Sequence, residues 1–143
     1  MKILIDADAC PVVGIAIACA QKTGIPVLLL CDTAHVLQRP GAQTVTVSKG
    51  ADSVDFQLVN RIQANDIVIT QDYGLAAMAM AKKARVLNQN GMRFTDDNMD
   101  ALLLARHTAR KIRMAGGRLK GPPKRTPADD MAFEQTLHAL LAE

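Results

Sequence analysis

The chain has 143 residues, of which 49% are hydrophobic, and a formal net charge of +3. That length and apolar content suit one domain with a sizeable core. We expect no membrane span, because no apolar run approaches the ~20 residues that a span needs, and no cleavable leader. The three cysteines, Cys10, Cys19 and Cys31, form no C-x-x-C pair. We therefore expect reduced thiols in a cytoplasmic protein, and no zinc site.

Apolar strand-like runs alternate with helical patterns along the chain. We expect strands near residues 2–6, 26–31, 43–48, 66–70 and 85–88, and helices near residues 11–23, 53–64, 73–83, 96–113 and 128–142. Strands separated by helices pair in parallel through right-handed crossovers. The pattern predicts a single doubly wound α/β domain over residues 1–143, with a five-stranded, mostly parallel sheet and helices on both faces. A basic loop at residues 114–127 and the helix at residues 128–142 belong to the same domain.

Two carboxylates directly follow the first predicted strand. Three branched apolar residues, Ile3 to Ile5, suit a buried parallel strand, and Asp6 then ends it. Asp8 lies in the turn, and Pro11 suits the first turn of the next helix. Open α/β sheets bind ligands beyond the carboxyl ends of their strands. Two aspartates in such a turn are therefore candidates for holding a hard cation.

Twelve of the 14 acidic residues are aspartate, a residue favoured at helix caps, turns and metal sites. All carboxyl ends of a parallel sheet share one edge, so position along the strands separates the candidates. Asp72 follows a predicted strand, as Asp6 and Asp8 do, whereas Asp66 begins one and should lie at the opposite edge. Asp55 opens the helix after the third strand. The candidate metal-binding and catalytic residues are Asp6, Asp8, Asp55 and Asp72, and an all-oxygen site of this kind suits Mg²⁺ or Mn²⁺.

Other acids and the histidines are weaker candidates for the metal site. Asp52 either caps the helix that follows it or joins the metal site, and both alternatives stay open. Asp96 and Asp97 follow Thr95, where acids complement a helix dipole. We expect the histidines to be structural or solvated: His35, His107 and His138.

The segment from Arg106 to Arg125 holds eight basic residues and no acid. Glycine and proline are frequent in residues 116–127, so the charges there lie on a loop. The segment is either a solvated connector or an arm that contacts phosphates, and we favour the arm. With no Trp, one Tyr and three Phe, the chain has few side chains that can stack on bases. RNA is the expected partner, and the proposed contacts are Arg118, Lys120, Lys124 and Arg125.

Four segments resemble the signature segments of the bacterial YaiI/YqxD family: residues 6–12 (DADACPV), 50–56 (GADSVDF), 66–76 (DIVITQDYGLA) and 121–126 (GPPKRT). The family is similar to the PIN-like nucleases in the placing of its acids, and the matching residues here are Asp6, Asp55 and Asp72. The resemblance implies a PIN-like fold with strand order 3-2-1-4-5. PIN nucleases usually carry a further Glu in mid-chain, whereas this chain has none before Glu134. That ligand is either absent here or replaced by Asp8 or Asp52.

Three functions compete. The leading hypothesis is a Mg²⁺- or Mn²⁺-dependent phosphodiesterase acting on RNA, in which the aspartates hold the metal and the basic segment holds the backbone. The second is a non-catalytic protein that binds a nucleotide or RNA, which the missing Glu favours. The third is a phosphatase of the haloacid-dehalogenase type, with Asp6 as nucleophile and Asp8 as general acid. The sequence leaves the oligomeric state open.

Overall fold

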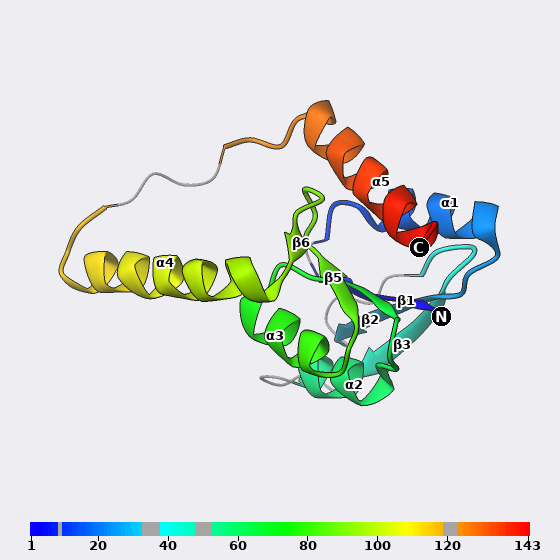
Figure 1. Cartoon of the computed structure of the whole chain (residues 1–143), viewed down its shortest axis with the longest axis horizontal. Helices are drawn as coiled ribbons and strands as arrows, with labels where there is room; N and C mark the ends of the chain where they lie inside the picture. The colour runs from blue at the N-terminus through cyan, green and yellow to red at the C-terminus, as the bar shows by residue number, and fades with distance from the viewer. Residues whose placement is uncertain (9, 33–37, 48–52, 119–122) are drawn as a thin grey trace.

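A computed structural model of the chain describes residues 1–8, 10–32, 38–47, 53–118 and 123–143. A helix follows β1, β3 and β4, and Figure 1 shows helices on both sides of the sheet. In chain order the elements are β1 (Ile3–Asp6), α1 (Val13–Thr23), β2 (Val27–Asp32), β3 (Gln43–Val47), α2 (Ser53–Arg61), β4 (Ile67–Ile69), α3 (Tyr73–Ala81), β5 (Arg85–Leu87), β6 (Arg93–Phe94), α4 (Asp96–Met114) and α5 (Pro127–Leu141).

β1 lies near the centre of the sheet, whose strand order is β3-β2-β1-β4-β5-β6. It pairs in parallel with β2 and with β4, and the register aligns Asp6 with Leu30 and Ile5 with Ile69. The sheet is therefore mostly parallel and doubly wound, as predicted. Because β1 and β4 run side by side in the same direction, the segments that follow them leave the sheet at the same edge.

The prediction of five strands is wrong, because a sixth strand, β6, pairs antiparallel with β5. The turn between them is stabilised by Asn88, whose side-chain oxygen accepts hydrogen bonds from the N–H groups of Asn90 and Met92, each at 2.9 Å. Gly91 has a φ of 83° and lies against the backbone of Ala132, where a β-carbon has no room. A strand of two residues is too short to show a periodic pattern.

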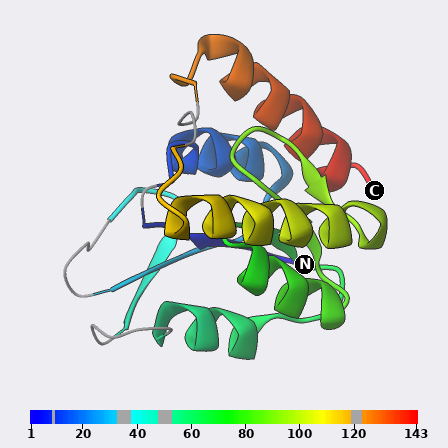
Figure 2. The ribbon, with the colours of Figure 1, turned by 90° about the vertical axis from the view of Figure 1, so that its left-hand side faces the viewer.

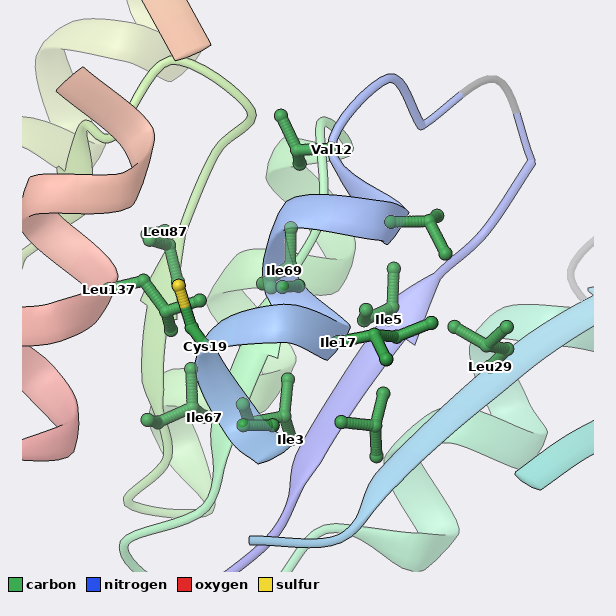
Figure 3. Close-up of a cluster of buried hydrophobic side chains, with 14 of the residues drawn as sticks. Ile3, Ile5, Val12, Ile17, Cys19, Leu29, Ile67, Ile69, Leu87 and Leu137 are labelled. Carbon is green, nitrogen blue, oxygen red and sulfur yellow. The ribbon is translucent and has the colours of Figure 1, made fainter. Parts of the chain in front are cut away.

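Apolar side chains cover both faces of the sheet. On one face, Ile3 and Ile5 of β1 pack in a cluster with residues of α1 and α5, which Figure 3 shows in close-up. On the other face, Leu4 packs in a cluster with residues of α2, α3 and the start of α4. Successive side chains of a strand point to opposite faces, so burial on both faces explains why β1 is apolar without alternation.

The last two helices contact the domain to very different extents. α5 packs on α1 and buries Phe133, Leu137 and Leu140. Met99 is the one buried residue of α4. Figure 1 shows the C-terminal part of α4 projecting from the rest of the domain, and in Figure 2 this helix crosses in front of the domain. No helix in the described ranges is long and apolar enough to cross a bilayer.

Candidate acidic site

Thr70 connects the ends of the two central strands. It is 2% exposed, and its hydroxyl donates a hydrogen bond to Oδ2 of Asp6 at 3.1 Å. The same oxygen accepts a hydrogen bond from the backbone N–H of Asp72, also at 3.1 Å. A hydroxyl can donate and accept at the same time, so the two contacts are compatible. Thr70 thereby fixes Asp6 relative to the turn that follows β4.

Asp72 caps α3. Its backbone is extended, and Oδ1 accepts a hydrogen bond from the N–H of Leu75 at 3.1 Å. A side-chain oxygen in this position satisfies one of the N–H groups that the first turn of a helix leaves unpaired. Asp72 is exposed, so the carboxylate remains accessible to a ligand while one of its oxygens caps the helix.

Three of the predicted aspartates, Asp6, Asp8 and Asp72, line one open pocket with a volume of about 360 Å³. Gln71, Tyr73 and Arg106 line the rest. The pocket thus combines the end of β1, the turn after β4 and one side of α4. Arg106 was predicted as part of the basic segment and not of the site, because the local sequence pattern does not show which part of the sheet α4 approaches.

The pKa of Asp6 is raised to about 6. Burial of the carboxyl group is the main cause, because a buried charge loses its hydration. The hydrogen bond from Thr70 lowers the pKa, whereas the negative charges of Asp55, Asp8 and Asp72 raise it. Asp55, in the first turn of α2, therefore lies close enough to act on the same edge of the sheet. A cation bound among these like charges would relieve their repulsion.

Asp66 lies at the opposite edge of the sheet, as predicted. It is 1% exposed, and its carboxylate accepts hydrogen bonds from Nζ of Lys2 at 2.7 Å and from the backbone N–H of Lys2 at 3.1 Å. A third hydrogen bond comes from the N–H of Gln63 at 2.8 Å. A buried carboxylate with these partners has a structural role, which is to hold the start of β1 on the start of β4.

One other group of possible metal ligands lies between α1 and α5. Within the part of the chain that the structure describes, only Cys19, Glu134 and His138 place three ligand atoms within 4.8 Å of one another. Burial raises the pKa of the Cys19 thiol, which favours the thiol over the thiolate that metals bind. We therefore assign Cys19 to helix packing. The aspartates of the pocket do not place three oxygens within 4.8 Å of one another, so in this arrangement one Mg²⁺ ion could not be bound directly by all three and would keep water ligands.

Arg125, one of the predicted phosphate contacts, is bound within the protein. Its guanidinium donates hydrogen bonds to Oδ1 of Asp130 at 2.9 Å, to Oδ1 of Asn90 at 2.6 Å and to the carbonyl oxygen of Gln89 at 2.8 Å. These bonds tie the segment before α5 to the turn between β5 and β6. The geometry therefore gives Arg125 a structural role in addition to any contact with a ligand.

The other predicted contacts are dispersed. Arg118 and Lys124 are exposed on the segment between α4 and α5. Lys120 lies outside the described residues, and so does Asp52, which was predicted either to cap α2 or to bind metal. Arg106 is the basic residue that the structure brings to the acidic pocket.

Comparison with known proteins identifies the chain's relatives over almost its whole length. The family described as "Uncharacterized BCR, YaiI/YqxD family" matches residues 4–143. The chain belongs to the YaiI/YqxD family. The resemblance of the four sequence segments to that family is therefore confirmed, and the region matched to the YaiI/YqxD family includes every residue of the acidic pocket.

Individual YaiI/YqxD relatives are close in sequence and in length. A UPF0178 protein of Exiguobacterium sibiricum is 54% identical over 143 residues, which cover 100% of this chain and 98% of that protein. A UPF0178 protein of Ruminiclostridium cellulolyticum is 52% identical over 137 residues, which cover 96% of this chain and 90% of that protein. No solved structure gives a significant match.

Proposed function

We propose that this YaiI/YqxD protein is a divalent-metal-dependent phosphodiesterase that acts on RNA. The observation that carries the proposal is the gathering of Asp6, Asp8 and Asp72 around one open pocket with Arg106 at its wall. Carboxylates suit a hard cation, and a guanidinium suits a phosphate group. The matching acids of the PIN-like nucleases, Asp6, Asp55 and Asp72, support the same chemistry by analogy.

The donor set of the pocket fits Mg²⁺ or Mn²⁺. Its acidic groups are oxygen donors, which both ions prefer. Asp6, Asp8 and Asp72 would hold the ion, partly through water molecules because their oxygens are widely spaced, and the charge of Asp55 would add to the attraction, as its effect on Asp6 indicates. A bound ion of this kind lowers the pKa of a water molecule and stabilises negative charge on a leaving oxygen.

The protein's own groups orient the acids and the substrate. Thr70 holds Oδ2 of Asp6, and the N–H of Leu75 holds one oxygen of Asp72. Both carboxylates are therefore already held in position before a ligand binds. Arg106 lines the same pocket, where its guanidinium can bind a phosphate oxygen of the RNA backbone. We regard Thr70 as a positioning residue, since it acts through Asp6 and Asp72.

The variant Asp72→Asn tests the proposal without removing the helix cap, because Asn caps helices about as well as Asp. We expect Mn²⁺ to raise the melting temperature of the wild type, since a ligand that binds only the folded state stabilises it. We also expect metal-dependent cleavage of single-stranded RNA. Asp72→Asn should lose both effects. The control Asp97→Asn removes an equal charge from the exposed first turn of α4 and should keep both.

The outcomes separate the candidate functions. Cleavage that survives in both Asp72→Asn and Asp6→Asn would exclude this pocket as the active site. Stabilisation by Mn²⁺ with RNA binding but without cleavage would favour a non-catalytic binding protein, which the absence of any Glu before Glu134 also favours. Release of inorganic phosphate from a monoester, with a phosphoryl group trapped on Asp6, would indicate haloacid-dehalogenase chemistry instead.

A further inference from the structure

α4 has two apolar faces, and the domain covers one of them. Met99 is buried and Leu102 is half-buried, and both pack with the core beneath α2 and α3. A second set of residues lines an apolar groove of about 460 Å³ on α4 itself. Their spacing of three and four residues places them on one stripe along the helix. This outer stripe consists of Ala101, Leu104, Ala105, Thr108, Ala109 and Ile112.

The outer stripe is left in contact with water. Leu104 is 65% exposed and Ile112 is 39% exposed. From Ala101 to Ile112 the stripe runs along about 17 Å of helix. Contiguous apolar patches on a protein surface mark sites of interaction, whereas single exposed apolar residues are ordinary. The stripe therefore requires a partner surface of similar length that is apolar along its centre.

The charges of α4 indicate what that partner is. The acids of the helix, Asp96, Asp97 and Asp100, all lie near its N-terminal end, and its basic residues lie in the second half: Arg106, Arg110, Lys111 and Arg113. Two such helices in parallel would oppose like charges. In antiparallel orientation, the acidic end of each helix lies beside the basic end of the other, and the helix dipoles also attract. α4 is thus complementary to itself in one orientation.

We propose that α4 pairs antiparallel with α4 of a second copy of this chain through the outer stripe. When the pair is centred on the stripe, Leu104 meets Thr108 of the other copy and Ile112 meets Ala101, because the two residues of each pair lie on nearly the same side of the helix. Each large side chain therefore meets a smaller one. Asp100 and Lys111 lie on the same side of the helix, because they are separated by about three turns. Each Asp100 therefore meets Lys111 of the other copy.

The pairing leaves the acidic pocket accessible. Arg106, which lines that pocket, lies about 120° around the helix from the centre of the outer stripe. Met99 lies on the same side as Arg106 and already packs on the domain. The inner face of α4 therefore serves its own domain, while the outer face serves the second copy.

Sedimentation velocity of the full chain over a range of concentrations tests the pairing. We expect the wild type to show a monomer–dimer equilibrium. Leu104→Glu should weaken the dimer by about tenfold or more, because it places a charge at the centre of the interface. The control is Met131→Glu, which changes a residue of α5 that is 61% exposed and should leave the equilibrium unchanged. Circular dichroism and melting temperature confirm that both variants are folded.

A charge exchange tests the antiparallel register. Asp100→Lys and Lys111→Asp should each weaken the dimer by about fivefold, and the double variant should restore it, because both contacts are then reversed. A wild type that stays monomeric at all concentrations would overturn the proposal and would indicate that the outer stripe binds a different protein. A dimer that survives Leu104→Glu would overturn it as well, and so would a double variant as weak as the single ones.

Discussion

Asp6 makes the free energy of unfolding depend on pH. Its pKa is about 6 in the folded protein, against 3.8 for an unperturbed aspartate, chiefly because the carboxyl group is buried. Between these two values the folded state binds more protons than the unfolded state, so stability should fall as the pH rises through this range. Asp6→Asn removes the titration. We expect it to raise the free energy of unfolding near pH 7 by about 1–3 kcal/mol.

Urea denaturation of the wild type and of Asp6→Asn over a series of pH values measures this contribution. The difference between the two proteins should be small where Asp6 is protonated in both states, should grow as the pH rises from about 3.8 to about 6, and should then level off. Asn retains an oxygen that can accept the hydrogen bond from Thr70. A difference that stays constant with pH would mean that the folded protein does not perturb the carboxyl group.

Asp6 and Asp72 could be predicted from the sequence to lie at one edge, because strand topology alone decides that placement. Thr70 could not be predicted as their link. A threonine at the end of a buried strand is ordinary, and its acceptor, Asp6, lies 64 residues away in the chain. The cap that Asp72 forms on α3 was also missed, although the short polar side chain before a helix is its usual signal.

The contact between the starts of β1 and β4 depends on Asp66. Asp66→Ala would leave the ammonium of Lys2 and two backbone N–H groups without this buried acceptor. We expect the free energy of unfolding to fall by roughly 3 kcal/mol, as when one partner of a buried ion pair is removed. Chemical denaturation measures the loss, and Asp97→Asn is the matched control for removal of an exposed charge. A loss no greater than in the control would show that the contact adds little to stability.

Elements with long, periodic patterns were predicted best. The parallel strands and the helices that separate them have the expected order, and differences fall at their ends. The helix predicted to reach residue 64 ends at Arg61, since the N–H of Ile62 bonds to the carbonyl of Val59 in a tighter turn. β6 was missed because its signal lies in the turn around Gly91 and not in a strand pattern. For α4, the sequence indicates a helix but not which of its apolar faces the domain covers.

The acidic pocket is lined by residues from three parts of the chain that are far apart in sequence. β1 and the turn after β4 bring its carboxylates together, and α4 adds Arg106. The segment between α4 and α5 then returns to the domain, where Arg125 is held by Asp130 and by the turn between β5 and β6. Charges far apart in the chain are thus brought together in the pocket, where Arg106 lies beside the aspartates, whereas Arg125 is held at the turn between β5 and β6.

Binding of single-stranded RNA tests the basic groups of this arrangement. Each phosphate neutralised contributes roughly −0.7 to the slope of log K against log salt concentration. Arg118 and Lys124 are exposed, so replacing both by Ala should flatten the slope by roughly 1.4 and weaken all sequences alike, because phosphate contacts do not read bases. Stabilisation by Mn²⁺ should survive in this double variant, since neither residue lines the acidic pocket.

Arg125→Ala separates a structural role from an electrostatic one. Its guanidinium bonds to Asp130, Asn90 and the carbonyl of Gln89, so the variant should unfold at a lower urea concentration, whereas Arg118→Ala should not. Breaking hydrogen bonds to a charged group typically costs about 1.5–3 kcal/mol.

If the salt slope of RNA binding is unchanged in the Arg118 and Lys124 double variant, the segment between α4 and α5 is a solvated connector. Among the residues that the structure describes, Arg106 in the pocket would then be the remaining support for a phosphate-containing substrate.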